Sequence, residues 1–176
     1  MNKKENVVIF IGDSQIAYGD WSVLLNRTDV LNFGNAGDVT ADVLSRLNEL
    51  YPYFPSKIFI QVGTNDLSLG IPQPQIIQHY EELIDKLKEH HQAVEIYINS
   101  VFPVQDLPGE FYQNSEILSL NRGLKKLCAD KGVHYINVSD EFVDDSGNLK
   151  DSLTTDGLHL NEAGYRIWTS IINTYL

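Results

Sequence analysis

Four short polar clusters in this sequence combine the residue types that nucleophilic catalysis needs. Together they supply a serine, a histidine, an amide side chain, several carboxylates and the glycines that permit sharp turns. In chain order they are Gly12-Asp13-Ser14-Gln15, the stretch from Asn32 through Gly34 to Gly37-Asp38, Gly63-Thr64-Asn65-Asp66, and Asp156-Gly157-Leu158-His159. These residue types could carry out the cleavage of an ester through a serine nucleophile.

Ser14 and His159 are the candidate nucleophile and base. A serine hydroxyl attacks poorly at neutral pH unless a base lies within hydrogen-bond reach. An imidazole can take the proton and return it to the leaving alcohol, because it titrates near physiological pH. Asp156 precedes His159 by three residues. Its carboxylate is therefore expected to accept from the other ring nitrogen, which would fix the tautomer and stabilise the imidazolium.

The oxyanion that forms when an ester is attacked needs hydrogen-bond donors, and three are predicted. They are the N–H of Ser14, the N–H of Gly37 and the side-chain amide of Asn65. The loss of one such donor typically costs ~10²–10³ in turnover. Asp13 and Asp66 are expected to support the serine turn and the Asn65 loop through hydrogen bonds rather than to react.

Each cluster alone also has an ordinary structural interpretation. A Gly-Asp-Ser turn occurs by chance, and Gly-Thr-Asn-Asp is more often a polar turn that caps a helix. Gly37 could be a simple turn glycine, and His159 could belong to a helix-cap region at the surface or in the core. The order of all four clusters, and their positions at predicted strand or helix ends, make chance a poor explanation.

The elements that must position these clusters alternate along the chain. Five apolar runs predict strands that are covered on both faces, as in a parallel sheet: Val7–Ile11, Val30–Phe33, Lys57–Val62, Val94–Val101 and Val133–Val138. Amphipathic patterns between and after them predict helices: Asp20–Asn26, Ala41–Leu50, Gln75–His91, Asn114–Lys131 and Asn161–Leu176. Gly132 is expected to end one helix, and Pro72 and Pro74 to punctuate the loop before another.

This alternation predicts an α/β fold, a three-layer α/β/α sandwich with right-handed crossovers. In such sheets ligands bind outside the carboxyl ends of the strands, which is where the first three clusters fall. The chain shows no internal repeat or linker, so residues 1–176 are expected to form a single domain.

The four clusters and their order resemble the SGNH hydrolase superfamily, the GDSL esterases and lipases. The matching positions are Ser14, Gly37, Asn65 and His159 with Asp156, and the likeness covers essentially the whole chain. It is strongest to small bacterial esterases similar to platelet-activating-factor acetylhydrolase catalytic subunits. Gln15 departs from the pattern, because the name-giving leucine usually stands there, and it is expected to influence pocket shape rather than mechanism.

The resemblance implies a flavodoxin-like sheet of five parallel strands in the order 2-1-3-4-5. It implies a single SGNH/GDSL domain and an esterase that needs no cofactor. Relatives of this type are often dimers, so a homodimer is left open, although no self-complementary patch is evident in the residues.

Composition narrows the range of partners and compartments. The formal net charge of −11 disfavours nucleic acid and anionic membranes as partners. The run Val7–Ile11 is too short for a signal-peptide core, and a cytoplasmic location is the default expectation. The only cysteine, Cys128, rules out an internal disulfide and is expected to be a buried hydrophobe.

The remaining polar and aromatic residues suggest structural roles first. No cluster has metal-ligand spacing, so no metal is predicted. A solvated helix face is expected for His79, His90 and His91, and a structural role for His134. Pocket or core positions are both open for Tyr18 and Trp21. The loops 67–74 and 102–114 are expected to shape the leaving-group side, with Phe102, Phe111 and Tyr112 as candidate walls.

Three functions remain open at this point. The leading hypothesis is an ester hydrolase for small-molecule esters with short acyl groups, chiefly acetyl, that works through an acyl-enzyme. The alternative is an acyltransferase that uses the same residues on a sugar or small alcohol. A non-catalytic nucleotide-binding module is disfavoured, because no glycine-rich phosphate loop follows the first strand.

Overall fold

A five-stranded parallel sheet forms the centre of the molecule. The structure is a computed structural model that describes residues 5–105 and 113–176. The strands lie in the order β2-β1-β3-β4-β5 and all pair in parallel, which confirms the predicted topology. Their bounds are β1 Glu5–Gly12, β2 Val30–Gly34, β3 Phe54–Gln61, β4 Glu95–Asn99 and β5 His134–Ile136.

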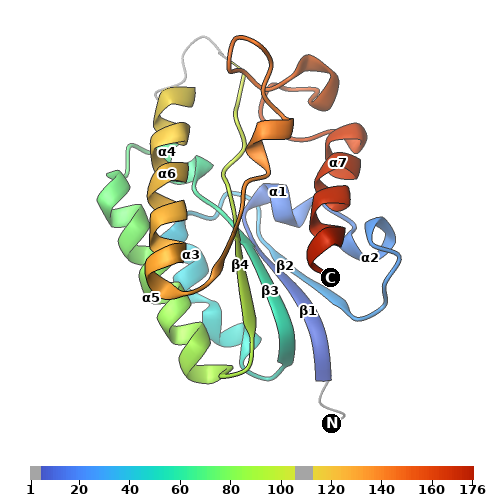
Figure 1. Ribbon diagram of the computed structural model, residues 1–176, viewed down its shortest axis with the longest axis vertical. Helices are drawn as coiled ribbons and strands as arrows, with labels where there is room; N and C mark the ends of the chain where they lie inside the picture. Colours follow the sequence, from blue (N-terminus) through green and yellow to red (C-terminus); the bar gives the residue numbers. More distant parts are fainter. Residues whose placement is uncertain (1–4, 106–112) are drawn as a thin grey trace.

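Helices cover both faces of this sheet (Figure 1). One layer contains α3 (Thr40–Ser45), α5 (Gln73–His90) and α6 (Asn114–Lys131), and the other contains α1 (Ser14–Ala17), α2 (Trp21–Leu24) and α7 (Glu162–Ile172). The short α4 (Thr64–Ser68) follows β3 and contacts α6. The described residues therefore form the predicted three-layer sandwich.

Alternation along the strands supplies the two cores. On β1, Val7, Ile9 and Ile11 pack with α3, α5 and α6, whereas Val8 and Phe10 face α2 and α7. Successive side chains of a strand point to opposite faces, so a continuous apolar run is required when both faces are covered. That requirement is what made the strands recognisable in the sequence.

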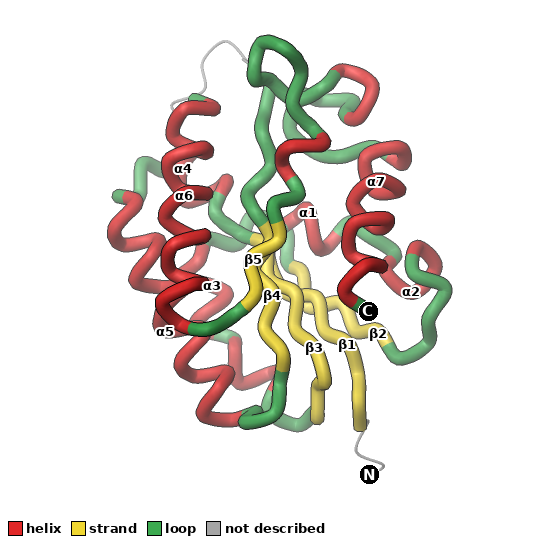
Figure 2. Tube along the Cα trace, in the orientation of Figure 1, coloured by secondary structure: helices red, strands yellow, loops and turns green. Residues whose placement is uncertain are grey.

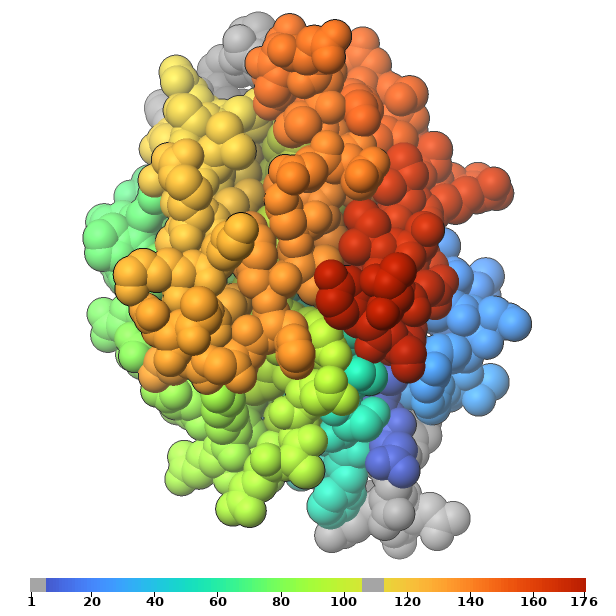
Figure 3. All heavy atoms as spheres, in the orientation of Figure 1, coloured from blue at the N-terminus to red at the C-terminus, as the bar shows by residue number. Residues whose placement is uncertain are grey.

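Aromatic rings dominate the core under α2 and α7. Phe10 stacks on Trp21 with ring centroids 4.1 Å apart and on Phe59 at 4.9 Å, and Phe59 stacks on Tyr97 at 4.8 Å. In the space-filling view, the first residues of β4 and β3 reach the surface below the C-terminal segment (Figure 3). On these two strands Lys57 Nζ donates to both Glu95 (3.0 Å) and the Tyr97 hydroxyl (3.0 Å), so polar groups lie beside the aromatic rings there.

Several boundaries differ from the predicted ones. The helix expected over Ala41–Leu50 breaks at Arg46 into α3 and a turn of 3₁₀ helix over Leu47–Leu50. Pro74 lies inside the first turn of α5 rather than in the preceding loop, which is tolerated because first-turn N–H groups have no helical acceptor. The last helix ends at Ile172 and continues as a 3₁₀ turn over Asn173–Tyr175. Gly132 ends α6 in the left-handed conformation, as predicted.

The remaining fold expectations concern Cys128 and the membrane. Cys128 is buried in α6, and burial raises the pKa of its thiol to about 12, which confirms its role as a small apolar residue. Within the described ranges, no helix has the length and hydrophobicity that a membrane crossing requires.

Candidate active site

The candidate nucleophile lies on a sharp turn at the carboxyl end of β1. A side chain at Gly12 would place its Cβ 1.8 Å from the carbonyl oxygen of Gln61 on β3, so only glycine fits there. The next residue, Asp13, accepts a hydrogen bond from the N–H of Gln15 (3.0 Å) and thereby caps α1. Ser14 is the first residue of this helix, where backbone N–H groups have no helical acceptor. The turn therefore places both the hydroxyl and the N–H of Ser14 at the carboxyl end of the sheet.

The structure brings Ser14, His159 and Asp156 together from opposite ends of the chain. Ser14 Oγ lies 3.0 Å from His159 Nε2, and His159 Nδ1 lies 2.7 Å from Asp156 Oδ2. With a proton on Nδ1, the imidazole donates to the carboxylate and its Nε2 accepts from the serine hydroxyl. The three predicted side chains therefore lie within hydrogen-bond distance of one another, in the order Ser14, His159, Asp156.

Asp156 is held as a carboxylate. Its partial burial alone would raise its pKa, but hydrogen bonds from the ring and N–H of His159 and from the N–H of Leu158 lower the pKa to about 2. These backbone bonds to Asp156 Oδ1 measure 2.7 Å from His159 and 2.9 Å from Leu158. The carboxylate therefore stays ionised at neutral pH and can stabilise an imidazolium.

Thr154 stabilises the loop that carries the candidate base. Its hydroxyl donates to the carbonyl of His159 (2.7 Å) and accepts from the N–H of Gly157 (3.0 Å). The carbonyl of Gly157 accepts from the N–H of Gln105, beyond β4 (2.8 Å). Loops such as these gather at the carboxyl end of the sheet, above the strands in Figure 2.

The loop after β2 carries the second predicted donor. Gly37 adopts φ +89°, and a Cβ placed on it would meet no atom within 4 Å, so open space faces this residue. Asn65, in the first turn of α4, directs its amide nitrogen to the carbonyl of Asp38 (2.9 Å). That bond occupies one of the two N–H groups of the amide, and the other has no recorded partner among the described residues. The structure thus places Asn65 against the Gly37 loop.

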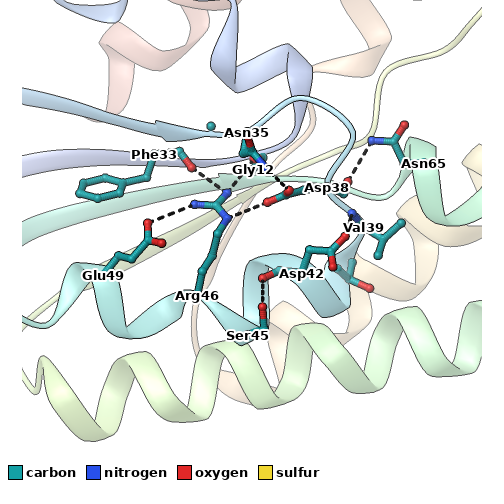
Figure 4. A network of polar contacts seen from close by, with 12 residues as sticks. Gly12, Phe33, Asn35, Asp38, Val39, Asp42, Ser45, Arg46, Glu49 and Asn65 are labelled. Carbon is teal, nitrogen blue, oxygen red and sulfur yellow. Dashed lines mark hydrogen bonds and ion pairs between the residues drawn. The ribbon is translucent and has the colours of Figure 1, made fainter.

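Arg46 anchors the same loop from below (Figure 4). Its Nε donates to Asp38 Oδ2 (2.7 Å), and its Nη2 donates to the carbonyls of Gly12 (3.2 Å) and Phe33 (2.9 Å). Asn35 donates to the other oxygen of the Asp38 carboxylate (2.5 Å). One guanidinium therefore ties the ends of β1 and β2 to the loop that bears Gly37.

Asp66, which follows Asn65 directly, ties the Asn65 turn to the start of α3. Both of its oxygens accept from the N–H of Thr40 (3.1 and 3.0 Å), and the Thr40 hydroxyl donates to Oδ1 (2.5 Å). Burial raises the pKa of Asp66, and the bonds from Thr40 offset part of that rise. His79 lies 2.8 Å from the same hydroxyl through Nδ1 and is half-buried, so the expectation of a solvated helix face was wrong for it.

Asp13 is fully buried, and Oδ2 of its carboxylate has no hydrogen-bond partner among the described residues. Burial raises the pKa of Asp13 to about 7, and the nearby carboxylates of Asp66 and Asp38 contribute to the rise. The folded chain therefore keeps this proton at pH values where the unfolded chain has lost it.

We expect the Asp13→Asn variant to gain stability relative to wild type as pH rises. Because the pKa of Asp13 is higher in the folded chain, its proton contributes to the stability of the wild type. This contribution is complete below about pH 4 and is lost as the pH rises through about 7. The slope is up to about 1.4 kcal/mol per pH unit. Asparagine caps the helix equally well and does not ionise. Urea unfolding of both proteins at pH 4.5, 6 and 8 measures the difference, and parallel stability curves would refute it.

The remaining aromatic predictions have mixed outcomes. Trp21 and Phe102 are almost wholly buried in the core, so neither is a pocket wall. Tyr18 is 59% exposed, and its ring centroid lies 5.2 Å from that of His159, so it borders the site. Phe111 and Tyr112 lie outside the described residues.

Two contributors to the site, Arg46 and Thr40, were not predicted, and the hydrogen bonds of Gln15 to the His159 segment were not predicted either. Each of the three forms a bond to a residue far away in the sequence: Gln15 to Leu158, Thr40 to Asp66 and Arg46 to Gly12. Within residues 5–105 and 113–176, no group of three or more His, Cys, Asp or Glu side chains is arranged to hold a metal ion.

Comparison with known proteins gives a consistent match. Residues 10–167 match the family described as GDSL-like lipase/acylhydrolase. Human platelet-activating factor acetylhydrolase IB subunit alpha1 is 28% identical over 169 residues, which cover 92% of this chain and 71% of that protein.

Two solved structures share the architecture. A Streptococcus pneumonia protein named after platelet activating factor superposes with a TM-score of 0.90 at 28% identity, over 97% of this chain and 84% of the other. A lipase/acylhydrolase from Enterococcus faecalis shares the fold with a TM-score of 0.81 at 22% identity, over 97% and 94% of the two chains.

Proposed function

Since this chain belongs to the GDSL-like lipase/acylhydrolase family and is a hydrolase that acts on esters, we propose that it cleaves short-chain esters through an acyl-enzyme on Ser14. The observation that carries this proposal is the relay of two hydrogen bonds, 3.0 Å from Ser14 Oγ to His159 Nε2 and 2.7 Å from His159 Nδ1 to Asp156. A nucleophile, a base and a group that orients the base are thereby in contact.

The first half-reaction acylates Ser14. Its Oγ forms a bond to the ester carbonyl carbon while the hydroxyl proton passes to His159 Nε2. The negative charge on the former carbonyl oxygen is stabilised by the N–H groups of Ser14 and Gly37 and by the free N–H of Asn65. When the carbon–alkoxy bond breaks, His159 returns the proton to the leaving oxygen, and the alcohol departs.

The second half-reaction repeats these roles with water. His159 takes a proton from a water molecule that attacks the acyl carbon, and the same donors stabilise the second oxyanion. Cleavage of the bond to Ser14 Oγ releases the acid and returns the proton to the serine. Asp156 stays ionised throughout, because its pKa of about 2 lies far below neutral pH.

Two features support a small acyl group, chiefly acetyl. The human relative at 28% identity is named an acetylhydrolase. In this chain the candidate oxyanion loop is open to solvent at Gly37, and the ring beside His159, Tyr18, is exposed rather than part of a deep apolar tunnel. These two positions offer little apolar area that could stabilise a long acyl chain.

We expect acetate and butyrate esters to be cleaved far faster than esters of long-chain acids, without activation at a lipid interface. The measurement is the kcat/KM of a series of p-nitrophenyl esters of increasing chain length, run beside acetylated sugars, with Ser14→Ala as the background control. A preference for acyl groups of about ten or more carbons would contradict the open-site interpretation. Product analysis with added alcohols or sugars decides whether water or an alcohol receives the acyl group.

A further inference from the structure

Gln15 follows the candidate nucleophile directly, and its side chain bonds the backbone on both sides of the candidate base. Its Nε2 donates to the carbonyl of Leu158 (2.8 Å), and its Oε1 accepts from the N–H of Leu160 (3.4 Å). The two partners flank His159. One amide side chain therefore pairs with the His159 segment as a neighbouring strand would.

Gln15 is itself held firmly by its own backbone. Its N–H donates to Asp13 Oδ1 (3.0 Å), and its carbonyl accepts from the Tyr165 hydroxyl of α7 (2.7 Å). Only 3% of the residue is exposed. Because its backbone is fixed, the side chain can hold the groups that it bonds in a defined position.

We propose that Gln15 is a positioning residue that holds His159 Nε2 within hydrogen-bond distance of Ser14 Oγ, an inference that rests on the proposed function. Apart from the Ser14–His159 contact itself, the other bonds described above for the His159 loop are internal ones through Thr154 and Asp156 and one to Gln105, and none of these reaches the serine turn. The Gln15 bonds do reach it, because Gln15 and Ser14 are adjacent. A leucine, the usual residue of the motif, could neither donate to Leu158 nor accept from Leu160.

The expected consequence of losing this contact is a slower chemical step with little change in substrate binding. Displacement of a catalytic group by about 1 Å can cost ~10² in rate. We therefore expect Gln15→Met, which keeps the length of the side chain and removes both bonds, to lower kcat by roughly 10- to 100-fold with KM nearly unchanged.

Gln61→Met is the matched control. Gln61 is also a fully buried glutamine at the carboxyl end of a strand, but neither atom of its amide bonds any described residue. The hydrogen bond that joins it to the serine turn uses its backbone carbonyl, which accepts from the N–H of Asp13 (3.4 Å). Its replacement removes a buried amide without touching the His159 segment, so kcat should stay close to that of wild type.

The experiment compares p-nitrophenyl acetate kinetics, thermal unfolding and the proton NMR signal of the His159–Asp156 hydrogen bond in wild type, Gln15→Met and Gln61→Met. We expect the kcat loss and a broadened or absent signal in Gln15→Met alone. If Gln15→Met does not fold, Gln15→Leu carries the same test, because leucine also removes both bonds.

Two results would overturn the positioning role of Gln15. One is wild-type kcat with an unchanged NMR signal in a folded Gln15 variant, and the other is an equal loss in Gln61→Met. Either outcome leaves the proposed function intact if Ser14→Ala still abolishes turnover. Absence of Ser14-dependent turnover in wild type would instead contradict the proposed function itself.

Discussion

Ser14→Ala and His159→Ala are each expected to reduce ester turnover to the background rate while the fold stays intact. Ser14 Oγ and His159 Nε2 are 3.0 Å apart, so each group depends on the other for the same proton transfer. Where the nucleophile and the base of a serine hydrolase act as a unit, the loss of either residue lowers kcat by a factor on the order of 10⁶. The measurement is the turnover of p-nitrophenyl acetate, with circular dichroism as the control for folding.

The double variant separates a shared relay from two independent contributions. Once Ser14 is gone, His159 has no hydroxyl to deprotonate, so Ser14→Ala/His159→Ala should cost little more than either change alone. Full additivity of the two losses would show that the residues act separately. In that case the 3.0 Å contact would be a structural hydrogen bond without a role in turnover.

Asn65→Ala is expected to lower kcat by roughly 10²–10³ with a much smaller change in KM. The bond from its free N–H matters mainly to the oxyanion, whose charge exceeds that of the ground-state carbonyl. Because the amide is neutral, it should add no titration to the pH profile. Asn65→Asp should be slower still, since it places a negative charge beside a developing one.

Asn35, on the loop that carries Gly37, offers a matched control for Asn65. Asn35 and Asn65 each donate one hydrogen bond to Asp38, the former to its carboxylate and the latter to its carbonyl. Asn35→Ala therefore measures the effect of a loosened loop, and we expect a clearly smaller loss of kcat from it. Equal losses in the two variants would remove Asn65 from the oxyanion hole and leave it as a loop anchor.

The strand pattern and the four polar clusters were predictable from the sequence because both are local. A parallel strand must be apolar on both faces, which marks Val7–Ile11 and Lys57–Val62 clearly. The sharp turn at Gly12 is likewise recognisable, because a close approach of two strands requires glycine. The order 2-1-3-4-5 followed from family resemblance rather than from residue pattern.

The short helices and the roles of Arg46 and Gln15 could not be predicted, because they depend on contacts between residues that are far apart in the sequence. The one-turn helices α1 and α4 are too short to show a helical period. Arg46 lies in an amphipathic stretch, and only the fold reveals that its guanidinium faces the ends of β1 and β2. Gln15 was expected to affect pocket shape alone, whereas it bonds the backbone around His159, 143 residues away at Leu158.

Covalent labelling tests the central claim most directly. A serine-directed fluorophosphonate should inactivate the wild-type protein with one adduct per chain, and peptide mass spectrometry should place that adduct on Ser14. Labelling should be much slower in His159→Ala, since the hydroxyl then lacks its base. Unlabelled protein that retains full ester turnover, or an adduct on a different residue that accounts for the inactivation, would contradict the assignment of Ser14 as the nucleophile.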